Sequence, residues 1–508
     1  MILQSLSRRA FRQVLHTGEQ NNFRIFRLAP ILVVIIALAL AGIAAARSSA
    51  RTRSDVTPPA SAPGNAAPAS PPVSETNQQF MAAADQVLEQ MSKIVDLPIK
   101  RPLKKSLRSR AQIRAFLISE EKHGESKSQE YADDKSLEAF GLIPEGFPLD
   151  SFMIDLLTEQ VAGMYDPKAK EFYIADWIPI ADQREVMAHE LTHALEDQSF
   201  HVEHWIDAAK NNDDAESARQ AVSEGSAMAA MIDYSLRDAH TSVRDLPDVT
   251  LLFQSGALGS LDKDPELAKA PMYIRDSLIF PYLAGTSFTQ QFLKAHTGWA
   301  DLKLVFENPP VSTQQIIHPD LYLKGVKPAN VTLPKWKRVV PKKWKLLEEN
   351  VMGEFGLQEL LKQFLGSDRA QAISSAWSGD RYAVFEIKHT SETPLVFRLK
   401  LDNLKDTARF FGEFSDALDK KYTARTAVHG RRDFLEFQTV GGGVFLRCVA
   451  DECLDVERAS PATFDAIDRA IGWTPAPEPR SFAPSVQGDA TLGKEPHSRS
   501  SESAIAVQ

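Results

Sequence analysis

The sequence predicts an α+β protein that begins with a membrane-spanning segment. Residues 182–198 and 214–236 have the composition of long, partly buried helices. Residues 382–449 contain several short strand-like runs, and residues 28–46 form an apolar run without a charge. The helix predicted over residues 182–198 also carries a sequence motif that indicates a chemical activity.

This helix contains the pattern H-E-x-x-H, with His189, Glu190 and His193 at its defining positions. Positions i and i+4 lie on one face of a helix, so both imidazoles can reach one zinc ion while Glu190 leans toward the metal's open position. Residues 182–198 contain no Pro or Gly, which favours an uninterrupted helix. The pattern predicts the metal-binding helix of a zinc protease. The alternative is a pair of histidines that only make hydrogen bonds on a helix face.

A catalytic zinc ion needs a third protein ligand, with water in the fourth position. The metzincin pattern would place Gly and His three and six residues after His193, but Glu196 and Ser199 stand there, which excludes that class. The thermolysin-like solution is a Glu from the following helix. Glu224 lies there among small residues, which let two helices approach closely. We therefore expect His189, His193 and Glu224 to be the metal ligands.

Neighbouring residues complete the predicted site. Asp214 is expected to cap the second helix. Asp197, four residues after His193, is placed to accept the far ring proton of an imidazole. Three residues after the motif helix remain alternative third ligands if the chain turns back sharply: His201, Glu203 and His204.

Three stretches resemble a bacterial family of largely uncharacterised gluzincin-type metallopeptidases. They are TEQVAGMYDP (158–167), HELTHALEDQ (189–198) and SEGSA (223–227), where Ser226 replaces an acidic residue of the family pattern. If that acid orients a zinc imidazole, its loss weakens the support of the metal. The resemblance continues through 280–285 and 309–319, and less specifically into 376–386, so that it covers roughly 97–386. It implies a zincin-like fold, with a small sheet over the motif helix and a mostly helical half behind it.

Zinc held by the three ligands would acidify its bound water and polarise the scissile carbonyl, while Glu190 acts as general base. The oxyanion needs a further donor. Tyr282 and His318 are the candidates, because each stands in a loop-like setting beside Pro or Gly; the alternative for each is a side chain hydrogen-bonded within the packing. We expect a zinc-dependent endopeptidase. The alternatives are an inactive zincin-like scaffold or binding protein, and a zinc hydrolase of a non-peptide amide such as a cell-wall bond.

A hairpin is predicted shortly before the motif helix. Residues 161–165 and 172–175 have the composition of strands, joined by a polar turn. In zincins the edge strand at this place captures an extended peptide by adding a strand to the sheet. The alternative is an ordinary sheet edge.

The N-terminal part of the chain predicts a membrane location. Residues 28–46 would span about 28 Å as a helix, close to the thickness of the bilayer core. Arginines in the arm 1–27 favour a cytoplasmic N-terminus and an extracytoplasmic catalytic domain, periplasmic or extracellular. A cleaved signal peptide is the alternative, although the arm is long for one. The Pro-rich residues 47–76 are predicted to be a spacer.

The remaining residues divide into a metallopeptidase domain over 77–350, a small α+β domain over 351–473 and a disordered tail over 474–508. The small domain is predicted from two helices and four strand-like runs: 404–420, 461–471, 382–387, 395–401, 434–439 and 443–449. The alternative is that it extends the main domain.

The charges and cysteines limit the partners. The net charge of −9 argues against nucleic acid, leaving a protein or peptide substrate and the membrane as expected partners, with the oligomeric state open. The basic cluster over 100–114 is predicted to be a solvated helix face, with a membrane-surface or inhibitory contact as the alternative. Cys448 and Cys453 would stand opposite each other on paired strands if 449–452 is a tight turn, and would then form a disulfide in an oxidising compartment.

Overall fold

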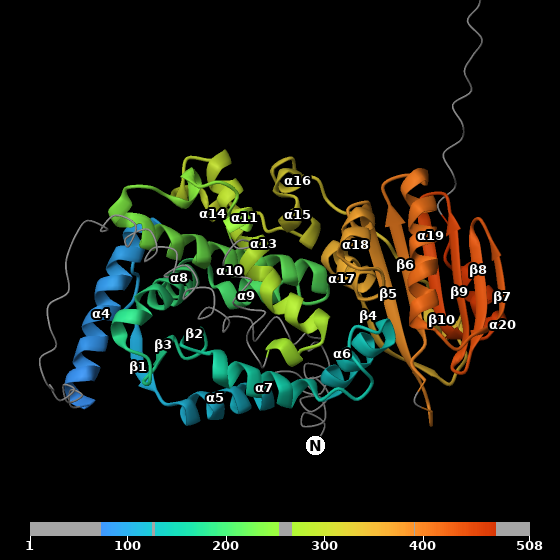
Figure 1. The fold of residues 1–508 in the computed structure, drawn as a ribbon, viewed down its shortest axis with the longest axis horizontal. Helices are drawn as coiled ribbons and strands as arrows, with labels where there is room; N and C mark the ends of the chain where they lie inside the picture. Colours follow the sequence, from blue (N-terminus) through green and yellow to red (C-terminus); the bar gives the residue numbers. More distant parts are fainter. Residues whose placement is uncertain (1–72, 124–126, 253–266, 391, 474–508) are drawn as a thin grey trace, which may run out of the picture. The chain divides into compact units, whose positions relative to one another are not determined.

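The computed structural model describes residues 73–123, 127–252, 267–390 and 392–473 (Figure 1). These residues form an α+β fold with one three-stranded sheet, one seven-stranded sheet and many helices. The predicted arm, the membrane segment, the spacer up to residue 72 and the tail lie outside the described residues. Among the described helices, none combines the length and the apolar character needed to cross a membrane.

The first sheet lies among the N-terminal helices. Its order is β1-β3-β2, with β1 parallel and β2 antiparallel to β3, so β2 is an edge strand. The strands β2 and β3 confirm the predicted hairpin. The elements of this part are α4 (Val73–Ile94), β1 (Lys104–Arg108), α5 (Arg110–His123), α6 (Lys127–Phe140), α7 (Leu149–Gln160), β2 (Gly163–Asp166) and β3 (Glu171–Ala175).

The basic cluster over 100–114 does not form the helix face that the sequence predicts. Lys104, Lys105 and Arg108 lie on strand β1, parallel to β3, and only Arg110 and Arg114 begin a helix, α5. The parallel partner strand is supplied by residues far along the chain, so local composition does not reveal it.

A group of helices follows the first sheet. Both long helices of the prediction are present, as α8 and α10. The helices are α8 (Arg184–Phe200), α9 (Val202–Asp207), α10 (Asp213–Leu236), α11 (Val249–Leu252), α13 (Met272–Ala295), α14 (Lys303–Glu307), α15 (Thr313–Ile317) and α16 (Pro319–Leu323).

The N-cap predicted for α10 is wrong. Asn212, in extended conformation, accepts a hydrogen bond from the Ala215 amide at 3.0 Å, as an N-cap does. Asp214 lies within the first turn, and its Oδ1 accepts the Thr313 amide and hydroxyl instead. A tertiary contact with α15 therefore takes the side chain that the sequence assigns to capping.

The second sheet is antiparallel throughout, with the order β4-β5-β6-β10-β9-β8-β7. Its first strand precedes the boundary predicted at residue 351, and the described residues form one compact unit. The elements are β4 (Trp344–Asn350), α17 (Gly353–Leu365), α18 (Ser367–Ser374), β5 (Trp377–Ile387), β6 (Leu395–Leu401), α19 (Leu404–Lys421), β7 (Thr426–Arg431), β8 (Phe434–Thr439), β9 (Gly442–Val449), β10 (Glu452–Ala459) and α20 (Pro461–Ala470).

The four strands and two helices predicted here are confirmed as β5, β6, β8, β9, α19 and α20, whereas β4, β7, β10, α17 and α18 are missed. The central strand β10 is almost wholly buried although it contains Glu452, Asp455 and Glu457. Glu452 pairs with Arg398, and Glu457 pairs with Lys421. These long-range partners allow buried charges that the alternating pattern of a sequence does not predict.

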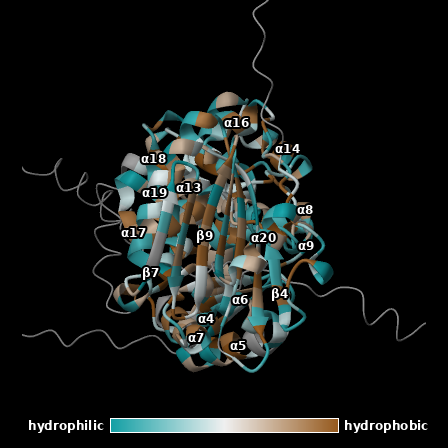
Figure 2. Ribbon diagram, turned by 90° about the vertical axis from the view of Figure 1, so that its right-hand side faces the viewer, coloured by the Kyte–Doolittle hydropathy of each residue, from teal (hydrophilic) through white to brown (hydrophobic). Residues whose placement is uncertain are grey.

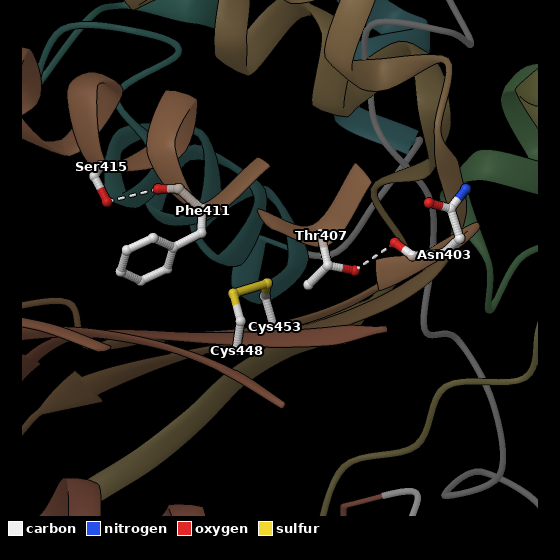
Figure 3. The surroundings of a disulfide bond; sticks show 6 residues. All are labelled: Asn403, Thr407, Phe411, Ser415, Cys448 and Cys453. Carbon is white, nitrogen blue, oxygen red and sulfur yellow. Dashed lines mark hydrogen bonds between the residues drawn. A yellow bond between two sulfur atoms is a disulfide. The ribbon is translucent and has the colours of Figure 1, made fainter. Parts of the chain in front are cut away.

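The disulfide joins the middle of the second sheet. Cys448 of β9 and Cys453 of β10 are directly opposite each other and are bonded, as the sequence predicts. Figure 3 shows the bond beneath α19, near Thr407 and Phe411. Apolar side chains of α19 such as Phe410 and Phe414 are buried on this side, and Figure 2 shows hydrophobic residues along the middle strands.

Candidate metal centre

Helix α8 carries the H-E-x-x-H pattern through the interior. All residues from Val186 to Gln198 are buried, because α4, α10 and the first sheet surround the helix. His189 and His193 lie one helical turn apart on one face. The helix ends at His201, whose left-handed conformation (φ 55°) stops it.

Helix α10 brings the third candidate ligand to the same place. Glu224 is 1 % exposed and lies across from His189 and His193. The next residue, Gly225, touches Gly285 of α13, so closely that a Cβ atom there would lie 2.0 Å from the Gly285 carbonyl carbon. The small residues around Glu224 thus allow a tight crossing with α13 as well as the approach to α8.

Three side-chain atoms converge at this point. The Nε2 atoms of His189 and His193 are 3.0 Å apart, and Oε2 of Glu224 lies 3.3 Å from the first and 3.4 Å from the second. Ligands of tetrahedral zinc, with bonds of about 2.1 Å, are separated by about 3.4 Å. Among the described residues this is the one group of three such side chains whose ligand atoms lie within 4.8 Å of one another. The donors and their spacing therefore fit a metal ion such as zinc.

The charges of the site also fit a cation. Burial alone would raise the pKa of Glu224, but the charge of His193 and contacts with both imidazoles lower it to about 2. Burial opposes protonation of His193, but the Glu224 carboxylate outweighs it and raises the pKa to about 9. Burial lowers the pKa of His189 to about 4, leaving its ring neutral. A proton on His193 thus balances the buried carboxylate in the absence of a metal, and a bound cation would replace it.

Glu190 lies beside the ligands but is not one of them. It is fully buried, and burial raises the pKa of its carboxyl to about 8. Its Oε2 accepts the Tyr165 amide at 2.8 Å, and Oε1 has no hydrogen-bond partner among the described residues. One carboxylate oxygen is thus held by strand β2 while the other stays available to a water or a substrate.

Asp197 does not orient an imidazole as the sequence predicts. Its Oδ2 accepts hydrogen bonds from the Tyr165 hydroxyl and the Lys170 ammonium group, both at 2.7 Å. Tyr165 therefore binds α8 twice, through its amide to Glu190 and through its hydroxyl to Asp197. Sequence analysis missed this link, because it depends on how β2 packs over α8. Tyr165 and Asp197 nevertheless stand in two of the three motifs that carry the family resemblance.

Serines of α10 lie around the ligands in place of the acidic residue expected there. The Ser223 hydroxyl lies 3.4 Å from Nδ1 of His193, and Ser226 donates to the Ser223 carbonyl oxygen at 2.9 Å. A further buried carboxyl, Glu196, belongs to α8. Burial raises its pKa to about 7, against the opposing effects of His193 and the nearby Ser226 hydroxyl. An acidic side chain therefore remains where α8 packs against α10, but it belongs to α8 rather than to α10.

The two predicted oxyanion donors lie in different surroundings. Tyr282 is fully buried and its ring stacks on that of His189, with centroids 6.1 Å apart. It does not lie in a loop as predicted: α13 continues through Pro281, because an internal proline removes only one helical hydrogen bond and the packing around α13 supports the rest. His318 lies between α15 and α16 and pairs with Glu354 of α17 at 2.8 Å. The structure thus brings Tyr282 to the candidate metal ligands and places His318 with a different carboxylate.

The alternative third ligands lie beyond the end of α8. His201 and His204 are exposed, and Glu203 is partly exposed on the short helix α9. The turn at His201 leads the chain onward into α9. None of the three belongs to the group of converging ligand atoms found among the described residues.

A comparison with known protein families finds a match over the second sheet. A family model, described as a domain of unknown function (DUF8575), matches residues 343–464, which run from the start of β4 into α20. No curated protein and no solved structure matches the chain. The metal centre lies outside the matched residues.

Proposed function

We propose that this protein is a membrane-tethered, zinc-dependent endopeptidase of gluzincin type with a zincin-like domain. The observation that carries the proposal is the convergence of His189, His193 and Glu224, with Glu190 beside them. Three protein ligands leave a coordination position open, as catalytic zinc sites do, whereas structural sites have four protein ligands. An unused carboxylate oxygen next to that position supports hydrolysis rather than a purely structural metal.

Zinc bound at this site would acidify a water molecule and polarise the scissile carbonyl. Glu190 takes the proton of the attacking water and passes it to the leaving amine. Tyr165 fixes one oxygen of Glu190, so that the other keeps a constant position during the transfer. Tyr282, beside His189, is the better placed of the two candidate donors to the oxyanion.

Strand β2 supports a peptide substrate. It pairs with β3 on one side, and its other edge carries the Tyr165 amide that holds Glu190. An extended peptide added along this edge would run past the general base. Glu190 and the ligand Glu224 are at most 1 % exposed, so the entry of a peptide requires an opening movement.

The disulfide supports an extracytoplasmic location. Bonds such as Cys448–Cys453 persist in oxidising compartments and are rare in the cytosol. This agrees with the anchor predicted over residues 28–46, which would leave the catalytic domain outside the cytoplasm.

The test combines metal analysis with peptidase assays on the full-length protein and three variants. Glu190→Gln should retain zinc and lose activity, and Glu224→Ala should lose most of the zinc. Glu203→Ala is the matched control and should keep both. Zinc in the wild type without cleavage of any peptide library would favour the inactive scaffold, and hydrolysis of cell-wall amides alone would favour the non-peptide hydrolase. A wild-type protein that binds no zinc would overturn the ligand assignment.

A further inference from the structure

We propose that the segment leading into β4 forms a surface that binds an anionic phospholipid bilayer. The basic surface consists of six exposed cations: Lys335, Lys337, Arg338, Lys342, Lys343 and Lys388. This proposal does not depend on the peptidase activity, because the basic surface shares no residue with the metal centre.

The charge of this segment is opposite to that of the whole protein. Residues 321–345 contain eight Lys or Arg residues and no Asp or Glu, in a chain with a net charge of −9. All eight cations are exposed. A local positive field therefore exists here that the overall charge conceals.

The segment holds its cations in a fixed, outward-facing arrangement. Trp336 and Trp344 both pack against Phe385 of the second sheet, with ring centroids 5.1 Å and 5.2 Å away. The Trp336 indole also donates to Glu349 at 2.9 Å. Further apolar residues of the segment cover the same apolar cluster: Leu333, Val339 and Val340. Because the apolar side chains point inward, the cations between them point to solvent.

The cations of the basic surface form no ion pair with another residue of the described part of the chain. Among the described residues, no carboxylate oxygen lies within 4.0 Å of any of the six. In the basic cluster over 100–114, by comparison, three cations form ion pairs: Lys105 with Asp85, Arg108 with Glu171 and Arg114 with Asp155. The basic surface is thus available to an external anion.

An exposed apolar side chain near the basic surface favours a bilayer over a soluble polyanion. Leu346 is 41 % exposed and lies on β4 opposite Phe385, three residues after Lys343. Surfaces that lie on membranes combine Lys and Arg with such residues. Single-stranded nucleic acid would need outward-facing aromatic rings for stacking, and both tryptophans here face inward. Each Lys or Arg near an anionic bilayer strengthens binding about fivefold.

The test measures hydrogen exchange of the full-length protein reconstituted in vesicles. Peptides covering residues 333–346 should exchange more slowly on vesicles containing phosphatidylglycerol than on pure phosphatidylcholine. The triple variant Lys337→Glu, Arg338→Glu, Lys343→Glu should lose this protection, since three reversed charges weaken binding on the order of 100-fold or more. All three side chains are exposed, so the fold should not change.

The matched control reverses three exposed cations of the other cluster: Lys100→Glu, Arg101→Glu and Lys104→Glu. This variant should keep the protection. Equal exchange on both vesicles, or equal loss in the control variant, would overturn the proposal. Protection by heparin or duplex DNA as strong as that by phosphatidylglycerol would replace the bilayer with a soluble polyanion as the partner.

Discussion

Replacing Gly225 by alanine tests how the metal centre is built. Gly225 of α10 and Gly285 of α13 are in backbone contact, and a Cβ atom on Gly225 would lie 2.0 Å from the carbonyl carbon of Gly285. Real Cβ atoms essentially never approach closer than 3.0 Å, so the helices must separate by about 1 Å. The obstructing atoms belong to the backbone and cannot rotate away.

The expected loss of stability has two opposing parts. Overpacking a close-packed interior costs about 1–3 kcal/mol, and a backbone obstruction belongs at the upper end. Alanine is a better helix former than glycine by about 1 kcal/mol, which offsets part of the cost. The net destabilisation by Gly225→Ala is therefore about 2 kcal/mol. Zinc affinity should also fall, because a displaced α10 shifts the Glu224 carboxylate relative to His189 and His193 on α8.

The assay is urea unfolding of the metal-free protein, followed by zinc titration. Gly412→Ala in α19 is the matched control, because Gly412 is a helical glycine with no atom within 4 Å of its added Cβ. The control should raise stability by up to about 1 kcal/mol. If Gly225→Ala stabilises the protein as Gly412→Ala does, with unchanged zinc affinity, the close crossing does not set the geometry of the site.

Three further predictions concern protons and hydrogen bonds. The Glu224 carboxylate raises the pKa of His193 to about 9 against the effect of burial, and His193 must lose this proton to bind a metal. Apparent zinc affinity should therefore rise about tenfold per pH unit up to pH 9. Competition titrations that show a flat pH profile would contradict this. Burial raises the pKa of Asp214 to about 7, so this carboxyl ionises above about pH 4 in the unfolded chain but keeps its proton in the folded protein. Its own contribution should therefore lower stability by about 4 kcal/mol as the pH rises from 4 to 7. Urea midpoints of Asp214→Asn should lack this part of the pH dependence, and an unchanged slope would refute it. Tyr165→Phe removes the hydrogen bond from the hydroxyl to Asp197 and keeps the bond from the amide to Glu190. The free energy of unfolding should fall by about 1–2 kcal/mol, while the zinc stoichiometry should not change. A variant that no longer binds zinc would show that the hydroxyl does more than hold the hairpin in place.

Local patterns predicted the parts of the site that lie on single elements. His189 and His193 share a face because the spacing of four residues matches the helical turn, whatever surrounds the helix. The hairpin and the disulfide pair followed from turn chemistry and strand alternation in the same way. Glu224 required one further step, the inference that small neighbours permit close packing of helices.

Local patterns did not predict the contacts between separate helices and strands. Three features depend on residues far along the chain. They are the helix that continues through Pro281 and carries Tyr282, the hydrogen bond from Tyr165 to Asp197, and the buried acids of β10. A side chain in the interior takes the partner that the packing brings within reach, and local sequence does not specify that partner.

By itself, the sequence determined the helix that presents two imidazoles and a carboxylate, because backbone geometry gives residues four apart a common face. Only the tertiary structure decided that Glu224 meets them, that Tyr165 holds Glu190, and that His318 pairs with Glu354 instead. These contacts arise from the crossing of α8, α10 and α13 and from the packing of β2 on α8. Side-chain volumes at many distant positions set those crossings together, and no short stretch of sequence contains them.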